Sequence, residues 1–288
     1  MDCCTQKCFR SMYNLIRVKN ALLTRPEKLL MPERLPLSAV IITKNEEDRI
    51  SRCLRSLVPL CHEVIVLDSG STDATVNIAK SEGAKVEHQN WLGFAAQKNE
   101  AISRASQSWV ILLDADEWLE PAAQIALSEL FQSGKVEQAD VWLLMRRVHF
   151  LGHRLRGSGS AREPVQRLFR SHLRHALIPV HEYLDISGSR VRASKIRLEH
   201  DTALSAEHYW QKLQSYARLW ADEQHKKGRR ASAIRGRLAA YAYLLKNLVI
   251  RGGFIDGRSG LQFHGLHARY ARMKYDTLRA LSKATGPP

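Results

Sequence analysis

The chain has 288 residues, of which 44 are Lys or Arg and 29 are Asp or Glu, so its formal net charge at pH 7 is +15. A hydrophobic content of 44% with 25% charged residues is typical of a globular protein and excludes a disordered tail or a fibre. The length allows one large domain or two small ones, so neither disulfides nor a structural metal is required for a core. Five cysteines, an odd number, favour a reduced intracellular setting. No apolar run reaches the roughly 20 residues of a membrane-spanning helix, so we expect no spanning segment.

The positive charge is unevenly distributed along the sequence. Residues 37–145 contain nine basic and sixteen acidic residues, whereas residues 146–288 contain 28 basic and ten acidic residues. This asymmetry predicts two different partners, one for an acidic N-terminal body and one for a basic C-terminal half. A nucleic-acid-binding protein more usually carries basic residues throughout its folded core, so we expect no nucleic-acid partner.

The pattern of apolar residues predicts an α/β fold. Residues 1–36 show no sustained periodicity and are predicted to form an arm outside the main fold. From residue 37 onward, short apolar segments typical of buried strands alternate with segments that have one apolar face at helical spacing. The predicted strands are 37–43, 63–68, 85–88, 109–114 and 141–145, and the predicted helices are 50–58, 73–83, 95–106 and 121–131. This alternation predicts a mostly parallel sheet that is flanked by helices and joined by right-handed crossovers.

The remainder of the chain predicts two further parts. Between residues 146 and 202 the pattern weakens into short strands, glycine-rich turns and basic residues. From about Ser205 the apolar spacing becomes helical. We therefore expect an α/β domain over residues 37–202, divided near residue 145, and a basic helical region over residues 203–288.

Polar clusters follow three of the predicted strands, at Thr43–Glu46, Asp68–Asp73 and Asp114–Glu117. Taken singly, each is explained by the preference for Asp, Ser and Thr in helix caps and turns. In an open parallel sheet, however, ligands bind beyond the carboxyl ends of the strands, where these loops meet at one rim. Asp114 and Asp116 are separated by one residue, so in an extended loop both carboxylates can flank one divalent cation. Such an ion would neutralise a diphosphate and stabilise the charge that develops on it as a leaving group.

These segments resemble the family 2 glycosyltransferases, a large group of inverting, nucleotide-sugar-dependent enzymes with the GT-A fold. The resemblance rests, in chain order, on Ala39–Glu47, Val66–Asp73, Gly93–Asn99 and Leu112–Glu117, and it covers residues 37–150. It implies that residues 37–145 form the nucleotide half of the domain and residues 146–202 the acceptor half. Three later segments resemble the subgroup that builds the inner core of lipopolysaccharide, including the β-1,4-glucosyltransferases that modify heptose. They are Arg167–Phe169, Val180–Glu182 and Gly252–Gly257.

The resemblance implies a set of residues that bind the nucleotide sugar. From the first two loops this set is Thr43, Asn45, Glu46 and Asp68. Thr43 and Asp68 would line the pocket for the nucleoside. Many relatives have an acid at the position of Ser69 that reads the base, so this serine leaves the choice of nucleotide open.

The resemblance also implies how the diphosphate would be held. Lys98 would lie near the nucleotide phosphates, and Asp114 would contact the ribose or the sugar-phosphate end. Asp116 would be the principal ligand of a Mg or Mn ion, with Asp114 as a second ligand.

An inverting transfer also needs a general base, which takes the proton from the acceptor hydroxyl as that oxygen attacks the anomeric carbon. We favour Glu182, because it follows the nucleotide half, where the acceptor is expected. Glu117 is a poorer candidate because it lies beside the expected metal ion. The alternative for His181 and Glu182 is a paired couple on the surface of a strand.

The C-terminal helical region combines Tyr, Trp and Leu with many Arg and Lys residues. This composition suits helices that lie on an anionic membrane with their cations near lipid phosphates, and it equally suits the solvated face of an ordinary bundle. A lipid-linked, phosphate-bearing acceptor favours the membrane interpretation. We therefore expect a cytoplasmic protein that is peripheral on the inner face of the inner membrane.

The combined prediction is a metal-dependent inverting glycosyltransferase. It would move a hexose, expected to be glucose, from a UDP-linked sugar to a glycolipid acceptor of the lipopolysaccharide inner core. A sugar nucleotidyltransferase is one alternative, but it normally has a glycine-rich basic loop after the first strand, which Thr43–Glu47 is not. A non-enzymatic nucleic-acid-binding protein is another, although the basic half contains no recognised motif for that role.

Overall fold

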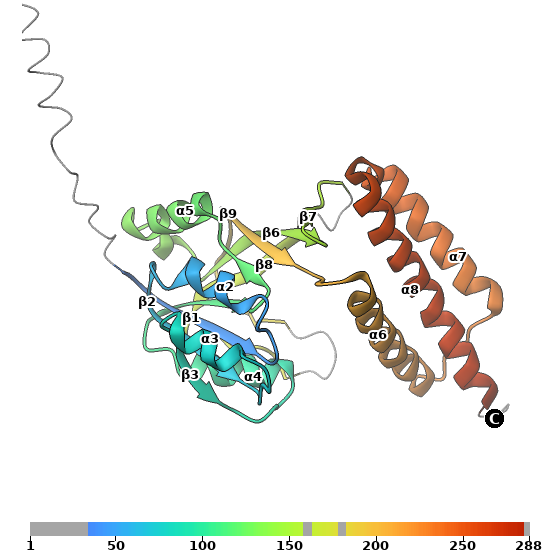
Figure 1. Cartoon of the computed structure of the whole chain (residues 1–288), viewed down its shortest axis with the longest axis horizontal. Helices are drawn as coiled ribbons and strands as arrows, with labels where there is room; N and C mark the ends of the chain where they lie inside the picture. Colours follow the sequence, from blue (N-terminus) through green and yellow to red (C-terminus); the bar gives the residue numbers. More distant parts are fainter. Residues whose placement is uncertain (1–33, 158–162, 178–182, 285–288) are drawn as a thin grey trace, which may run out of the picture. The chain divides into compact units, whose positions relative to one another are not determined.

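A nine-stranded sheet forms the centre of the α/β part of the chain (Figure 1). The computed structural model describes residues 34–157, 163–177 and 183–284, so most of the arm predicted at 1–36 lies outside the described residues. The strands are β1 (Leu35–Thr43), β2 (Cys61–Asp68), β3 (Lys85–His88), β4 (Trp109–Asp114), β5 (Glu117–Trp118), β6 (Val141–Phe150), β7 (His153–Arg154), β8 (Glu163–Arg170) and β9 (Val191–Asp201). Their order in the sheet is β3-β2-β1-β4-β8-β6-β9-β5, and β7 pairs with β6.

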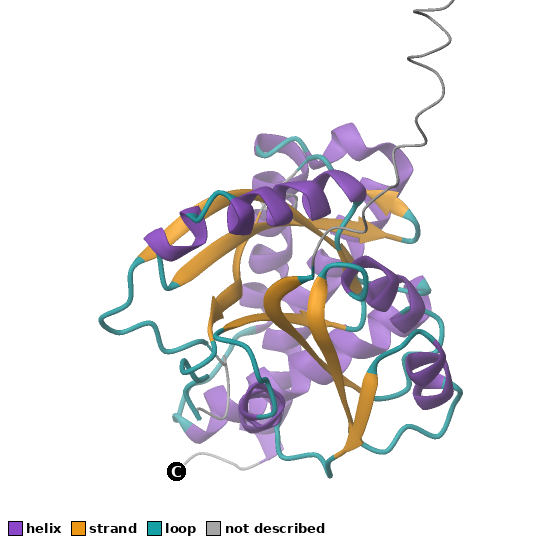
Figure 2. Ribbon diagram, turned by 90° about the vertical axis from the view of Figure 1, so that its left-hand side faces the viewer, coloured by secondary structure: helices purple, strands orange, loops and turns teal. Residues whose placement is uncertain are grey.

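Helices lie on both sides of the strands (Figure 2), and further helices follow the sheet in the sequence. The helices of the α/β part are α2 (Ile50–Leu57), α3 (Thr75–Ser81), α4 (Phe94–Ser103), α5 (Pro121–Gln132) and the short η1 (Lys135–Gln138). The C-terminal elements are α6 (Ala206–Lys226), α7 (Ala233–Leu244), the π-helical turn η3 (Leu245–Ile250), the 3-10 turn η4 (Gly253–Asp256) and α8 (Gly257–Ala284). The predicted α/β class with flanking helices and a helical C-terminal region is confirmed.

Strand β1 is the centre of the parallel part of the sheet. It pairs in parallel with β2 and β4, and β2 pairs in parallel with β3. Ala39 and Ile41 pack on the face that is covered by α2, α3 and α5, whereas Val40 and Ile42 pack on the face covered by α4. Because both faces are buried, these strands are apolar at almost every position, which made them recognisable in the sequence.

The rest of the sheet differs from the mostly parallel arrangement that the sequence predicted. Strand β8 runs antiparallel to β4 and β6, β5 runs antiparallel to β9, and only β6 and β9 pair in parallel. Strand β6 continues to Phe150, beyond the predicted end at residue 145. Strand β9 has exposed Arg and Lys side chains, and β8 begins with the exposed residues Glu163 and Pro164, so neither strand has a continuous apolar pattern.

A separate apolar core joins the C-terminal helices to the end of β6. The ring of Phe150 lies 5.5 Å from that of Tyr209 on α6 and 5.3 Å from that of Phe263 on α8, measured between centroids. Leu213 of α6 is buried in the same core, whereas the next apolar positions along that helix, Tyr216 and Leu219, are exposed. Within the described residues, none of the helices combines the length and the apolar character needed to cross a bilayer.

The segment Gly252–Gly257 connects these helices to the chain that follows β7. Asp256 accepts hydrogen bonds from the backbone N–H groups of Arg156, at 2.7 Å, and of Gly157, at 2.9 Å. A Cβ atom at Gly157 would lie 2.1 Å from the carbonyl oxygen of Gly252, so only glycine fits at this contact. The segment therefore has a structural role in docking the C-terminal helices.

Buried ion pairs of Arg167 join the parallel and antiparallel parts of the sheet. The Nη2 group of Arg167, on β8, donates to Glu117 Oε1 at 2.8 Å and also to the carboxylate of Asp114. Glu117 is fully buried, and its Oε2 accepts the backbone N–H of Asp114 at 3.1 Å. Burial raises the pKa of Glu117, and Arg167 opposes this effect. The buried carboxylate therefore depends on Arg167 for charge compensation.

The substitution Arg167→Met tests this dependence, because it removes the guanidinium and keeps most of the side-chain volume. We expect the free energy of unfolding, measured by urea titration, to fall by about 3–5 kcal/mol as Glu117 loses its closest cation. The control Arg192→Met changes an exposed arginine of β9 and should alter stability by less than about 1 kcal/mol. Adding Glu117→Gln to Arg167→Met should recover part of the loss. A double variant that is no more stable than Arg167→Met would contradict this explanation.

Candidate active site

The carboxyl ends of β1, β2 and β4 lie side by side, which confirms that the three predicted polar clusters share one rim. The parallel register pairs Thr43 with Asp68, and it pairs Ile42 with Asp114. Strand β9 also runs parallel to β4, because β8 is antiparallel to β4 and β6, and β6 is parallel to β9. The carboxyl end of β9 therefore reaches the same rim.

Two residues of the first loop, both predicted to bind the nucleotide sugar, have partners within the protein. The side-chain oxygen of Asn45 accepts the backbone N–H of Thr72 at 2.8 Å, and the backbone of Asn45 is left-handed, with φ of 54°. Both carboxylate oxygens of Glu46 accept hydrogen bonds from Arg49, each at 2.7 Å. Burial raises the pKa of Glu46, although Arg49 opposes the effect. The Asn45 contact joins two loops of the rim, whereas the Glu46 contact lies within one of them. A direct role of either side chain in nucleotide binding stays a prediction.

The predicted nucleoside side of the rim is formed by Thr43, Asp68 and Ser69. The buried carboxylate of Asp68 accepts backbone N–H groups of its own loop, the nearest from Gly70 at 2.9 Å. The hydroxyl of Ser69 accepts a hydrogen bond from the Gln97 amide at 3.0 Å, so this side chain is engaged inside the protein. The hydroxyl of Thr43 is buried and has no hydrogen-bond partner among the described residues. A bound ligand can supply the bond that this hydroxyl lacks.

Asp116 lies in the short loop between β4 and β5, and β9 brings His200 to it. The Nε2 atom of His200 lies 3.4 Å from Asp116 Oδ2, and Arg49 Nη1 lies 3.5 Å from the same oxygen. Burial opposes the ionisation of Asp116, but His200 and Arg49 outweigh it and hold the pKa of this carboxyl below its ordinary value. The other oxygen, Oδ1, is buried and has no hydrogen-bond partner in the part of the chain that the structure describes. Asp116 is therefore an ionised carboxylate with an oxygen available to a cation.

This donor set fits a divalent cation whose coordination is completed by a substrate. Asp116 offers a hard carboxylate oxygen, and His200 offers an imidazole nitrogen beside it. Over residues 34–157, 163–177 and 183–284, no group of three or more His, Cys, Asp or Glu side chains forms a full metal cage. Mg²⁺ is commonly held by one or two carboxylates together with substrate phosphates rather than by such a cage. The partial site therefore suits an ion that is bound together with a diphosphate.

Asp114, predicted to be the second metal ligand, pairs with two cations. One oxygen of Asp114 accepts from Arg167, and the other lies 4.0 Å from Lys98 Nζ. Burial opposes the ionisation of Asp114, but Arg167 and Lys98 outweigh it and hold its pKa well below the ordinary value. Lys98 is itself buried although it belongs to helix α4, so its charge is directed at the rim.

Sequence reasoning missed His200, Arg167 and Arg49 as members of this site. Spacing along the chain cannot reveal a partner of Asp116 that lies on a distant strand. His200 lies near the carboxyl end of a strand. Ligands of open sheets bind at such ends, and the same rule identified the Asp114 loop. The weak apolar pattern of β9 concealed this strand, and with it the position of His200.

Of the two candidates for the general base, only Glu117 lies within the described residues. Glu182 lies outside the described residues, so its role stays a prediction. Glu117 is fully buried, and both of its carboxylate oxygens are hydrogen-bonded, to Arg167 and to the Asp114 backbone. This environment closes Glu117 to an acceptor hydroxyl.

The described residues on either side of 178–182 are anchored near the rim. The Asn99 side chain donates to the carbonyl of His175 at 2.9 Å and accepts from its backbone N–H at 2.7 Å. His175 in turn pairs with Leu184 in an antiparallel bridge. Burial, together with the charges of Lys98 and Arg167, lowers the pKa of His175 to about 4. His175, on the described chain before residue 178, therefore lies within electrostatic reach of Lys98.

The sequence of the chain is similar to those of known glycosyltransferases. Residues 38–181 match the family described as Glycosyl transferase family 2. The lipopolysaccharide core biosynthesis glycosyltransferase LpsC of Rhizobium meliloti is 30% identical over 252 residues, which cover 83% of this chain and 92% of that protein. An uncharacterised glycosyltransferase of Rickettsia typhi is 29% identical over 256 residues, which cover 85% of this chain and 87% of that protein.

A solved structure of glucosyl-3-phosphoglycerate synthase from Mycobacterium tuberculosis, in complex with Mn²⁺, UDP and glucosyl-3-phosphoglycerate, is 25% identical, with a TM-score of 0.32. That match covers 41% of this chain and 45% of the other, so the chain spans less than half of that protein. The family match, in contrast, extends over half of this chain, and the alignment with LpsC extends over most of it. On these grounds the chain belongs to glycosyl transferase family 2.

Proposed function

We propose that this glycosyltransferase is an inverting, metal-dependent enzyme that moves a hexose from a UDP-linked sugar to a lipid-linked acceptor of the lipopolysaccharide core. The observation that carries the proposal is Asp116, an ionised carboxylate with an unpartnered buried oxygen beside His200, at the edge where open sheets bind ligands. The name of the relative LpsC, which assigns that protein to lipopolysaccharide core biosynthesis, supports the acceptor class.

Each side chain of the rim has a part in the proposed reaction. Asp116 and His200 would hold a Mg²⁺ or Mn²⁺ ion, which when bound would stabilise the negative charge of the departing diphosphate. Lys98 would add a second positive charge near the phosphates, and Arg167 keeps Asp114 ionised and in place. Thr43 would offer its unpartnered hydroxyl to the nucleoside. These charges are fixed before the substrate arrives, which favours the transition state over the ground state.

We assign the general base to Glu182. An inverting transfer needs a carboxylate that removes the proton of the acceptor hydroxyl while this oxygen forms the new bond to the anomeric carbon and the diphosphate departs. The burial of Glu117 removes the competing candidate. The anchoring of His175 by Asn99, close to Lys98, supports an acceptor site beside the segment that contains Glu182.

The acceptor would be met at an anionic membrane surface, which we propose is the inner face of the inner membrane. A row of apolar side chains, each more than half exposed, follows one face of α7 and η3. This apolar stripe consists of Ile234, Leu238, Tyr241, Leu245 and Val249. Basic residues lie along the same elements, among them Arg235, Lys246 and Arg251. Exposed apolar rows of this kind mark interaction surfaces, and flanking cations favour anionic lipid.

Titration calorimetry with UDP-glucose and Mn²⁺ tests the donor site. We expect binding that weakens at least about tenfold when EDTA replaces the metal, and again when Asp116→Asn or His200→Gln removes a ligand, each a loss of about 1.4 kcal/mol or more. The control Asp140→Asn changes a half-buried carboxylate outside the rim that pairs with Arg190, and it should bind as the unmodified protein does. GDP-glucose and ADP-glucose in parallel identify the base. Equal affinity with and without metal would overturn the metal-dependent mechanism.

The substitution Glu182→Gln tests the general base. We expect turnover to fall by about 10²- to 10⁴-fold, because the acceptor proton loses its recipient, while UDP-glucose affinity is unchanged. The control is Glu129→Gln, which neutralises an exposed glutamate of α5. The assay measures hexose transfer to truncated lipopolysaccharide core acceptors at saturating donor. Turnover of Glu182→Gln near the unmodified level would remove this residue as the base.

Sedimentation with lipid vesicles tests the membrane surface. The protein should sediment with vesicles that contain phosphatidylglycerol, bind neutral vesicles less, and be released by salt. Leu245→Gln combined with Val249→Gln should lower partitioning at least about tenfold, because each buried aliphatic side chain contributes roughly 1.5–3 kcal/mol. Ile125→Gln, at an exposed position of α5, is the matched control. Failure to bind anionic vesicles would refute the membrane role and leave the donor site unaffected.

A further inference from the structure

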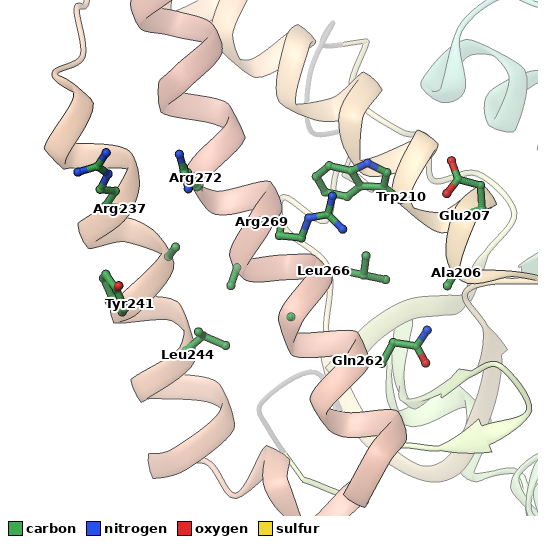
Figure 3. A pocket seen from close by; sticks show the side chains of 13 residues that line it. Ala206, Glu207, Trp210, Arg237, Tyr241, Leu244, Gln262, Leu266, Arg269 and Arg272 are labelled. Carbon is green, nitrogen blue, oxygen red and sulfur yellow. The ribbon is translucent and has the colours of Figure 1, made fainter.

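A groove of about 1100 Å³ lies between α6, α7 and α8, and it shares no lining residue with the rim that carries Asp116 (Figure 3). Helix α8 packs against both of the other helices and supplies the floor, which includes Leu266 and Gly265. Trp210 lines the groove from α6, and Tyr241 lines it from α7. This volume lies just above the range of about 300–1,000 Å³ that is typical of ligand sites, so the groove is large enough for a sizeable organic ligand.

One end of the groove is strongly cationic. Figure 3 shows Arg237, Arg269 and Arg272 at this end, contributed by α7 and α8. Arg272 binds Asp276 at 3.0 Å, whereas within the described residues neither Arg237 nor Arg269 has an ion pair with a carboxylate. The guanidinium of Arg269 lies 4.4 Å from the ring centroid of Trp210, which holds it beside the groove. Among the described residues, these two arginines thus line the groove without a carboxylate at ion-pair distance, and Glu207 is the carboxylate that lines the same groove.

The rest of the groove is lined by apolar side chains together with Glu207 and Gln262, and it opens toward the exposed stripe of α7. Leu244 and Tyr241 lie together on α7, and Leu266 lies on α8 below Arg269 (Figure 3). Tyr241 is 70% exposed and belongs to the apolar stripe that we propose contacts the membrane. An acyl chain that lay along this part would therefore end beside the apolar stripe.

We propose that this groove binds the phosphate-bearing lipid end of the acceptor, an amphiphile with an anionic phosphate joined to an acyl chain. Arg237 and Arg269 would bind the phosphate, because arginine recognises phosphate through paired N–H donors. Leu244 and Leu266 would contact the chain. An inorganic anion would leave the apolar part unused, and a neutral lipid would leave two arginines without a counter-charge. The assignment to the acceptor rests on the proposed function, whereas the binding of a phosphorylated amphiphile does not.

Calorimetry with octyl phosphate, kept below its micellar concentration, tests the groove on the full chain. We expect octyl phosphate to bind at least about tenfold more tightly than either inorganic phosphate or octyl glucoside, since only octyl phosphate uses both parts of the groove. The double variant Arg237→Gln/Arg269→Gln should lose at least about tenfold in affinity. Arg218→Gln, which changes an exposed arginine of α6 outside the groove, is the matched control.

The possible results distinguish a failure of the groove proposal from a failure of the donor-site proposal. Equal binding of octyl phosphate and octyl glucoside would overturn the phosphate contact, and equal binding of octyl phosphate and inorganic phosphate would overturn the lipid contact. Unchanged affinity of the double variant would place the site elsewhere. In the transfer assay, we expect the double variant to raise the KM for a phosphorylated lipid acceptor and to leave UDP-glucose affinity unchanged. An unchanged acceptor KM would refute the acceptor assignment even where transfer itself is established.

Discussion

The buried pairing of Arg167 with Glu117 and Asp114 is the interaction on which the rest of the site depends. Glu117 is fully buried, and it is tolerated there because a guanidinium from β8 compensates its charge. The same guanidinium binds Asp114, so one side chain joins β4, β5 and β8. This junction fixes the short loop that contains Asp116, since Asp114 and Glu117 are its two ends. The free carboxylate oxygen of Asp116 is therefore held in place by groups that have no contact with it.

The parts of the fold that the sequence predicted well are those buried on both faces. Strands β1, β2 and β4 each contain a continuous apolar run, so their ends, and with them Thr43, Asp68 and Asp114, were identified correctly as neighbours at one rim. Strand β9 is largely exposed and carries Arg and Lys, so neither the strand nor His200 at its end was predicted. A one-sided strand lacks the continuous apolar signal, and its pairing depends on distant segments.

Spacing along the chain also limited what could be predicted for individual residues. Asp116 followed from its proximity to Asp114, whereas the contact of Asn45 with Thr72 depends on how two loops fold against each other. The excess of positive charge was located correctly in the C-terminal half. Its organisation into a groove with arginines at one end and an apolar stripe beside it depends on helix packing, which composition cannot specify.

The central claim is that Asp116 and His200 hold a divalent cation together with the diphosphate of a nucleotide sugar. Crystals grown with UDP and Mn²⁺, with diffraction measured at the manganese absorption edge, locate the ion directly. The account predicts one anomalous peak at the rim, bonded to a carboxylate oxygen of Asp116, to Nε2 of His200 and to oxygens of the diphosphate. UDP bound at the rim with no manganese, or manganese bound to other side chains, would contradict it.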